Sequence, residues 1–195
     1  MAIRDTGTEQ LIKDTAMRIF FAEGKFNATT QDIADAAGVA RTVINYYFRS
    51  KDALFKLVFK EAMDDTKRRL DEVLLSSMPF KKKVVTFIDV FFIELNKYPY
   101  KESFMISEIN SQSFVMPDDR HSAALEPFFK EIKQAMDMGE VRKMLPINFV
   151  LNLFSLIAYP LLTRPLFKHM LEIPDAKFEQ LMQERKKMIL ELLFI

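Results

Sequence analysis

Between residues 41 and 51 the chain carries side chains that are suited to hydrogen bonding with nucleic acid. Arg41 can donate two parallel hydrogen bonds to guanine, and Asn45, one helical turn later, can pair with adenine. Tyr46 can offer its hydroxyl to a phosphate, and Lys51 can bring an ammonium group to the same backbone. No acid occurs in residues 36–51, so this stretch is a local basic patch in a chain whose formal net charge is only +1. The pattern favours contact with DNA.

Each of these residues also has a plainer interpretation. Arg41 could be a solvated surface arginine, and Asn45 could bond to nearby backbone groups instead of a base. Tyr46 and its neighbour Tyr47 cannot both point outward, because successive helical residues are about 100° apart. We expect Tyr46 to be the outer one and Phe48 to be core.

The residues around this patch predict two short helices bent at Gly38. The first has Thr30 as its expected N-cap and a buried stripe that begins at Ile33 and Ala34, and Gly38 supplies the left-handed residue that ends it. The second turns Val43, Ile44 and either Tyr47 or Phe48 inward and leaves its polar side chains outside. Two helices in this arrangement form a helix-turn-helix unit, whose second helix enters the major groove.

The rest of the chain also shows helical periodicity and no competing strand pattern. An opening helix runs from Thr6 to Gly24, and Ser50 is the expected N-cap of a long helix over 51–75. Further helices are expected at 80–97, 101–112, 120–138, 147–171 and 175–194. The sequence therefore predicts an all-α protein with two domains: a three-helix helix-turn-helix head at residues 1–50, and a bundle of about six helices at 51–195.

Composition argues against several other classes of protein. The chain has no cysteine, which excludes disulfides and thiolate chemistry, and its four scattered glycines cannot form a phosphate-cradling loop. His121 and His169 lack the spacing of metal ligands. We therefore expect no enzyme and no cofactor or metal. The N-terminus lacks a signal-peptide core and the apolar tract 147–162 is too short and too polar to span a membrane, so we expect a cytoplasmic protein without membrane contact.

Residues 6–55 resemble the DNA-binding domain of the TetR family of bacterial transcription regulators. The resemblance rests on Thr-Gln-Asp-Ile-Ala-Asp-Ala-Ala-Gly-Val and on Ile-Asn-Tyr-Tyr-Phe-Arg-Ser-Lys-Asp-Ala-Leu-Phe. It implies an all-α homodimer whose C-terminal domain binds a small molecule and then releases the operator. By position it implies DNA contacts from Thr30, Arg41, Thr42, Asn45, Tyr46, Tyr47 and Lys51. Thr42, Val43 and Asn45 differ from the residues common in the family, so base preference does not transfer.

An unidentified small-molecule effector would sit in the C-terminal part. The expected pocket is apolar or aromatic with a few polar contacts. Its candidate residues are Phe87, Phe91, Met105, Asn110, Phe128, Phe154 and Tyr159. The alternative is that these aromatic side chains only fill the core.

The last two predicted helices are the expected dimer interface, because they carry a broad apolar stripe and small residues that allow close approach. The candidate residues are Asn152, Ser155, Phe178, Leu181, Met182, Ile189 and Leu192. The alternative is that the stripes are buried within one subunit.

The sequence thus predicts a repressor released from a palindromic operator by a ligand. The competing hypothesis is a helical DNA-binding or interaction protein without ligand regulation.

Overall fold

The described part of the chain is built from helices, with one isolated β-bridge between Val141 and Phe194. The computed structural model describes residues 6–110 and 123–195, except for the side chains of 108–110. The helices are α1 (Thr6–Met17), the π-helical turn η1 (Arg18–Ala22), α2 (Thr30–Ala37), α3 (Arg41–Phe48), α4 (Lys51–Leu74), α5 (Phe80–Lys97), α6 (Lys101–Asn110), α7 (Leu125–Asp137), α8 (Pro146–Leu162), α9 (Arg164–Met170) and α10 (Asp175–Leu193). The all-α prediction is confirmed.

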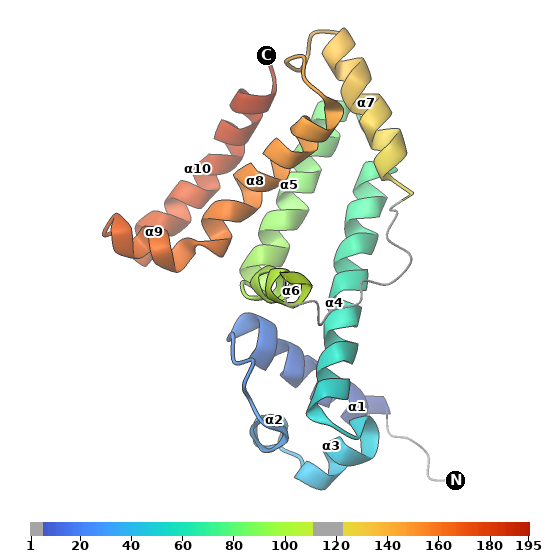
Figure 1. Ribbon diagram of the computed structural model, residues 1–195, viewed down its shortest axis with the longest axis vertical. Helices are drawn as coiled ribbons and strands as arrows, with labels where there is room; N and C mark the ends of the chain where they lie inside the picture. The colour runs from blue at the N-terminus through green and yellow to red at the C-terminus, as the bar shows by residue number, and fades with distance from the viewer. Residues whose placement is uncertain (1–5, 111–122) are drawn as a thin grey trace.

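Two groups of helices gather at opposite ends of the long helix α4 (Figure 1). We call α1, η1, α2 and α3 the head, and α5 and α7–α10 the body. Helix α6 lies across the molecule between the two groups. Two separate clusters of buried side chains correspond to them. Leu54 and Val58, near the start of α4, belong to the head cluster, whereas Val73 and Leu74 at its end belong to the body cluster, so α4 has a place in both cores.

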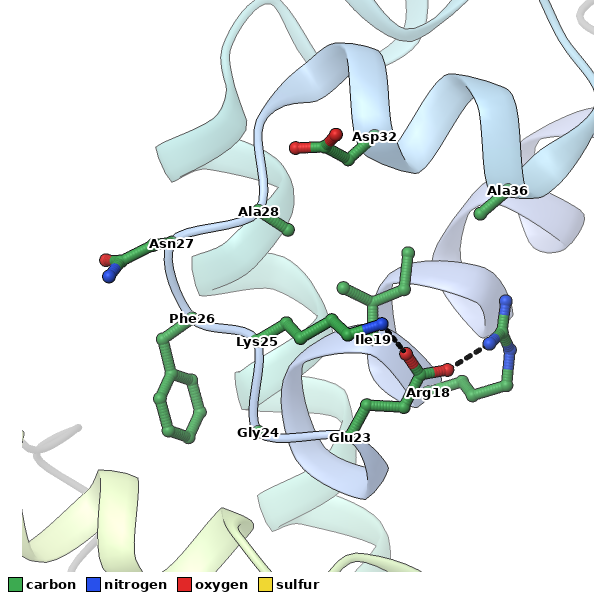
Figure 2. Close-up of a pocket in the computed structure, with 10 residues that line it drawn as sticks. All are labelled: Arg18, Ile19, Glu23, Gly24, Lys25, Phe26, Asn27, Ala28, Asp32 and Ala36. Carbon is green, nitrogen blue, oxygen red and sulfur yellow. Dashed lines mark hydrogen bonds and ion pairs between the residues drawn. The ribbon is translucent and has the colours of Figure 1, made fainter.

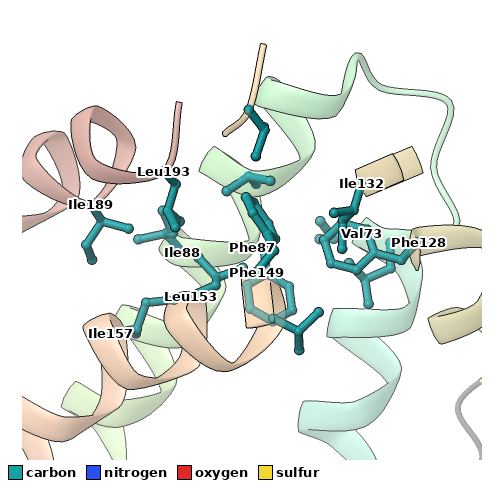
Figure 3. Packing of buried hydrophobic residues seen from close by; sticks show 14 of the residues in the cluster. Val73, Phe87, Ile88, Phe128, Ile132, Phe149, Leu153, Ile157, Ile189 and Leu193 are labelled. Carbon is teal, nitrogen blue, oxygen red and sulfur yellow. The ribbon is translucent and has the colours of Figure 1, made fainter. Parts of the chain in front are cut away.

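The body cluster joins α5, α7, α8 and α10 around phenylalanine and branched aliphatic side chains (Figure 3). Phe87 and Ile88 of α5 meet Phe149 and Leu153 of α8, and Ile189 of α10 closes the cluster on one side. All five are essentially excluded from solvent. Burying one such side chain contributes about 1.5–3 kcal/mol, so this cluster holds the bundle together.

The head helices begin and end at residues that satisfy the free backbone groups. Thr29, not the expected Thr30, caps α2: its hydroxyl accepts from the Asp32 N–H, and the Asp32 carboxylate accepts from the Thr29 N–H. Thr29 is favoured because it stands three residues before an acid, which completes a capping box. Gly38 ends α2 at φ +68°, as expected, and Ser50 caps α4 by accepting from the Ala53 N–H.

The segment expected as one helix at 147–171 is two. Helices α8 and α9 meet at Thr163 with a bend of 66°. Pro165 explains the break, because it has no N–H to donate to the Leu161 carbonyl and its ring would clash with that group. In the described residues, seven helices therefore follow α3, from α4 to α10, where about six were expected. Within the same residues no single helix has the length and apolar character to cross a membrane, and α8 with α9 would do so only as this bent pair.

Helix α6 and the turn before it pack directly against the head. The Phe104 ring lies 4.5 Å from that of Phe55, centroid to centroid, and the Tyr100 N–H donates to the Phe21 carbonyl at 3.1 Å. The Tyr100 ring also covers Gly24, where an added Cβ would come within 3.0 Å of it and where φ is +70°. The body is thus joined to the head at α6 as well as through α4.

A buried polar cluster lies at this junction. Lys101 of α6 is 0% exposed, and its Nζ donates to Thr66 of α4 at 2.6 Å and to Glu94 of α5 at 3.2 Å. Arg69 of α4 pairs with the other oxygen of Glu94 at 2.7 Å. Glu102, next to Lys101, is largely buried and its Oε2 has no hydrogen-bond partner among the described residues. Charged and polar side chains therefore connect α4, α5 and α6 in a region outside both hydrophobic clusters.

Candidate nucleic-acid interface

Helix α3 presents its polar side chains on one open face. Arg41, Thr42, Asn45 and Tyr46 are exposed, whereas Ile44 lies in the head cluster. A helix used for direct readout of bases needs this division, because the outer side chains must reach a groove while the inner ones hold the helix. Their contacts with DNA remain a prediction.

The two tyrosines of α3 divide as expected. Tyr46 is 62% exposed, whereas Tyr47 is half-buried and packs against the head cluster. Their rings meet edge to face at a centroid distance of 5.1 Å, and Phe48 is buried beside them. Tyr46 and Tyr47, together with Thr8 of α1, line a shallow groove along α3. Of the two hydroxyls, that of Tyr46 is therefore better placed to meet a phosphate.

Thr30 is the first residue of α2 and is half-buried. It does not cap the helix, because Thr29 does. Its predicted phosphate contact stays open, because the first N–H groups of α2 still lie beside it. The neighbouring acid, Asp32, is occupied by the cap: hydrogen bonding from the Thr29 N–H holds the pKa of its carboxyl below the ordinary value. Asp32 therefore keeps its negative charge at this helix end at neutral pH.

Lys51 has a structural contact that the sequence did not predict. Its Nζ donates to the Phe26 carbonyl at 2.7 Å and lies 6.0 Å from the centroid of the Phe20 ring. The side chain is half-buried. Lys51 thus ties the loop before α2 to the start of α4, and a phosphate would have to share the ammonium group with this carbonyl.

Arg49 belongs to the basic patch that the sequence indicates together with Arg41 and Lys51, but it was not among the predicted DNA contacts. It follows α3 directly, is exposed, and has φ +66° and ψ −41°. A sequence does not signal this conformation, because glycine or asparagine is the usual residue with positive φ.

A polar pocket opens on the side of the head, between η1 and α2 (Figure 2). Glu23 pairs there with Lys25 at 2.7 Å and also with Arg18. The hydrogen bond from Lys25, followed by the attraction of both cations, lowers the pKa of the Glu23 carboxyl. Both cations of this pocket are therefore already paired with the Glu23 carboxylate. The sequence analysis did not predict this pocket.

The predicted ligand residues are spread over the molecule. Phe87, Phe91 and Phe154 do meet, with centroid distances of 5.1–5.5 Å between α5 and α8. Phe128 instead lies beside Phe80, at 5.9 Å, and Tyr159 beside Phe167, at 6.0 Å. Three pockets on the described residues lie on the head and next to Phe194, and the walls of these three include none of the predicted ligand residues.

Two further ligand predictions need separate treatment. Met105 packs against the head cluster and not against the body aromatics, because α6 crosses between the two groups. Its predicted contact with a ligand stays a prediction. The side chain of Asn110 lies outside the described part of the chain.

The predicted dimer residues separate into an inner and an outer set. Phe178 is 2% and Ile189 0% exposed, so both are buried within the subunit and do not belong to an exposed interface. Leu181 and Met182 are half-buried, and Asn152, Ser155 and Leu192 are exposed. The reason is geometric: α10 packs on α8 and α5, and residues 11 apart, such as 178 and 189, lie on the same side of a helix.

Large apolar side chains on α8 and α10 are exposed, and Leu192 is the one among them that the sequence singled out. Leu151 is 56% and Leu192 53% exposed, and Ile147 and Met188 accompany them on the same two helices. An exposed apolar surface of this kind usually marks a contact with another molecule.

Comparison with known proteins points in one direction. Residues 12–58 match the model of the tetR family, described as bacterial regulatory proteins. An uncharacterized HTH-type transcriptional regulator of Bacillus subtilis (strain 168), YhgD, is 32% identical over 77 residues, which are 39% of this chain and 40% of that protein. The chain therefore matches less than half the length of this curated relative.

Solved structures resemble the chain over its whole length. A TetR family transcription regulator from Marinobacter aquaeolei VT8 has a TM-score of 0.61 at 16% identity, over 100% of this chain and 99% of that chain. A structure concerned with the control of antibiotic production by bacterial hormones has a TM-score of 0.64 at 18% identity, over 98% and 100% of the two chains. At these identities the likeness establishes the fold alone.

Proposed function

We infer that this chain is a member of the tetR family of bacterial regulatory proteins, and that it is a transcriptional repressor that binds a palindromic operator as a homodimer. A small apolar or aromatic ligand would release it. Members of this family are DNA-binding regulators and not enzymes. Because its target would be the bacterial chromosome, we place the protein in the cytoplasm.

The observation that carries this proposal is the outer face of α3. Arg41, Asn45 and Tyr46 are exposed together on a helix whose opposite side is anchored in the head cluster by Ile44 and Phe48. The head match over residues 12–58 includes the whole of α3. Such a helix can enter a major groove without rearrangement of the head.

A homodimer is supported by the exposed apolar side chains of α8 and α10. A two-fold interface uses the same surface on both subunits, and these two helices would then form a four-helix contact with their counterparts. Two heads would be presented together, so that the two α3 helices could occupy half-sites roughly 34 Å apart. The expected operator is therefore a palindrome.

Regulation would depend on the connections between body and head. Helix α4 contributes side chains to both clusters, and α6 contacts the head through Phe104 and Tyr100. A ligand that separates the body helices would move both connections. It must bind the arrangement that is unable to hold DNA more tightly, because equal affinity for both arrangements shifts neither.

An unregulated DNA-binding protein is the second candidate. The close contacts among Phe87, Phe91 and Phe154 favour it, because these rings fill the space where a ligand was expected. In that case the body would serve only to make the dimer.

Two measurements on the purified chain distinguish the candidates. Mobility shift with duplexes from the promoters beside its own gene tests operator binding, with a scrambled duplex of equal length as control. A thermal-shift screen of apolar and aromatic compounds then identifies stabilising ligands. A repressor loses the operator when such a ligand is added, whereas an unregulated protein keeps it. Equal affinity for every duplex would contradict operator recognition.

A further inference from the structure

We propose that Arg49 contacts a DNA backbone phosphate and that the chain retains an unfavourable backbone conformation at this position for that contact. The inference rests on the proposed DNA-binding function and adds a residue to it. Three observations support it: the backbone at Arg49, the freedom of its guanidinium group, and its place relative to α3.

The backbone at Arg49 forms a tight turn of an uncommon kind. The Ser50 N–H donates to the Phe48 carbonyl at 2.8 Å, which closes a three-residue γ-turn centred on Arg49. With φ +66° and ψ −41°, Arg49 has the rare and strained form of this turn. Its ψ also lies outside the left-handed region that asparagine and glycine usually adopt. A side chain with a Cβ is therefore unfavourable here, and glycine would be easier to accommodate.

The hydrogen bonds on both sides of Arg49 prevent the turn from relaxing out of this conformation. Arg49 still donates its N–H to the Asn45 carbonyl at 3.0 Å, which ends α3, and Ser50 already accepts from Ala53 as the cap of α4. One residue thus reverses the direction between two helices. Strained residues of this type concentrate at binding sites.

The guanidinium group of Arg49 has no acidic partner among the described residues. Arg18, Arg69 and Arg164, in contrast, all take part in ion pairs. The nearby ammonium of Lys51 is engaged by the Phe26 carbonyl. Among the described residues, Arg49 is therefore a cation of the α3–α4 turn that forms no ion pair.

Arg49 also stands directly at the end of α3. Its N–H donates to the Asn45 carbonyl, so its backbone adjoins the last turn of α3, and its side chain is exposed there. The last turn of a recognition helix and the start of the next helix lie against the backbone that borders the groove. A phosphate contact from Arg49 would fix the register of α3 and would carry no sequence preference.

The test compares Arg49→Gly, Arg49→Asn and Arg49→Lys with the wild-type full chain. We expect Arg49→Gly to raise Tm by a few degrees, because glycine relieves the turn. We expect the same variant to weaken binding about tenfold to the operator and to an unrelated duplex alike, and to reduce the slope of log K against log salt by about 1. Arg49→Asn should also lower that slope, and Arg49→Lys should keep it.

Lys130→Gln on α7 is the matched control, because it removes one exposed positive charge at the far end of the body. It should change neither the slope nor the affinity by more than about twofold. If wild type binds DNA and Arg49→Gly keeps full affinity and slope, Arg49 is not a contact. A lower Tm for Arg49→Gly would overturn the claim that the conformation is retained at a cost. Failure of the wild-type chain to bind any duplex would overturn the proposed function and this inference together.

Discussion

At the scale of single residues, the predicted contact residues on α3 and at the start of α4 divide between reading bases and positioning the backbone. Arg41 and Asn45 have exposed groups that match base edges, whereas Lys51 is held by the Phe26 carbonyl and orders the loop before α2. A substitution in the first group should alter recognition alone. A substitution of Lys51 should alter both recognition and stability.

Arg41→Ala tests the reading group. We expect an operator affinity lower by about 1–3 kcal/mol and a relaxed preference at one base pair, because a bidentate contact to guanine is worth that much. The thermal unfolding midpoint should be unchanged, because the side chain is exposed. Fluorescence anisotropy with a set of single-base operator variants measures both affinity and preference. Unchanged affinity would remove Arg41 from the contact surface.

Lys51→Ala tests the positioning role. We expect a loss of about 1 kcal/mol in the free energy of unfolding, because the Phe26 carbonyl loses a charged donor. Affinity should also fall equally for operator and unrelated DNA. Denaturant unfolding and anisotropy give the two quantities, and Lys56→Ala, an exposed position on the same helix, is the control. If stability is unchanged and only affinity falls, the bond to Phe26 has no energetic role.

At the scale of elements, α4 and α6 carry the connection between body and head. Glu94, Lys101 and Glu102 bring charges into the junction where α4, α5 and α6 meet. Such a buried cluster holds its helices in one arrangement only while every member is paired, because an unpaired buried charge is costly. Among the described residues, Oε1 of Glu94 and Oε2 of Glu102 both lack a hydrogen-bond partner, but Oε1 of Glu94 still forms an ion pair with Arg69 at 2.7 Å.

Glu102→Gln should therefore stabilise the protein at neutral pH. Burial raises the pKa of the Glu102 carboxyl, although the Lys101 ammonium opposes this. Between the ordinary and the raised pKa the folded chain binds more protons than the unfolded chain, so the free energy of unfolding falls as pH rises through that window. The variant lacks this loss. We expect a gain on the order of 1 kcal/mol at pH 7.5 that vanishes near pH 4.

Denaturant unfolding at both pH values measures this difference. Ser103→Ala, a neighbouring half-buried position on α6, is the control, and it should show no pH-dependent difference from wild type. A variant that is less stable than wild type at pH 7.5 would contradict the assignment of Glu102 as the unfavourable charge.

The head could be predicted well because its signals are local. Gly38, Ser50 and the apolar stripe from Ile33 lie within a few residues of the features that they determine. The one-residue error in the cap of α2 arose because Thr29 and Thr30 are both good caps, and Asp32 decided between them. The positive φ of Arg49 could not be predicted from the sequence, because arginine, unlike glycine, does not indicate this backbone conformation.

The body could be predicted only as a set of helices. Helix α10 has apolar residues on more than one side, so its sequence did not reveal that Phe178 and Ile189 face inward while Leu192 faces out. The junction cluster joins Thr66 to Lys101, and no local pattern links residues so far apart. The location of a ligand pocket also depends on long-range packing, which the sequence does not reveal. In the structure, aromatic rings of α5 and α8 contact one another.

At the scale of the whole molecule, the proposal requires two copies of the chain. Helices α8 and α10 present Leu151 and Leu192, both more than half exposed, on the outside of the body. A monomer would leave this apolar surface in water and would offer a single α3 to the DNA. Pairing through it both covers the surface and doubles the number of reading helices.

Leu192→Glu should therefore weaken the dimer. A carboxylate in an apolar two-fold contact is placed close to its own copy, and we expect the dimer dissociation constant to rise about 100-fold, or roughly 3 kcal/mol. Operator affinity should fall with it, while the helical content of the monomer stays the same. Sedimentation velocity over a range of concentrations measures the change. Leu75→Glu, an exposed leucine outside α8 and α10, is the control and should remain dimeric.

The most direct test of the central claim is the stoichiometry and sequence preference of the complex with DNA. Sedimentation of the purified chain with duplexes from the neighbouring promoters gives both, because the mass of the complex counts the subunits. We expect two chains on one palindromic duplex, and a much weaker complex when either half-site is scrambled. A complex of one chain, or one that is indifferent to the half-sites, would contradict a paired reading of DNA by α3.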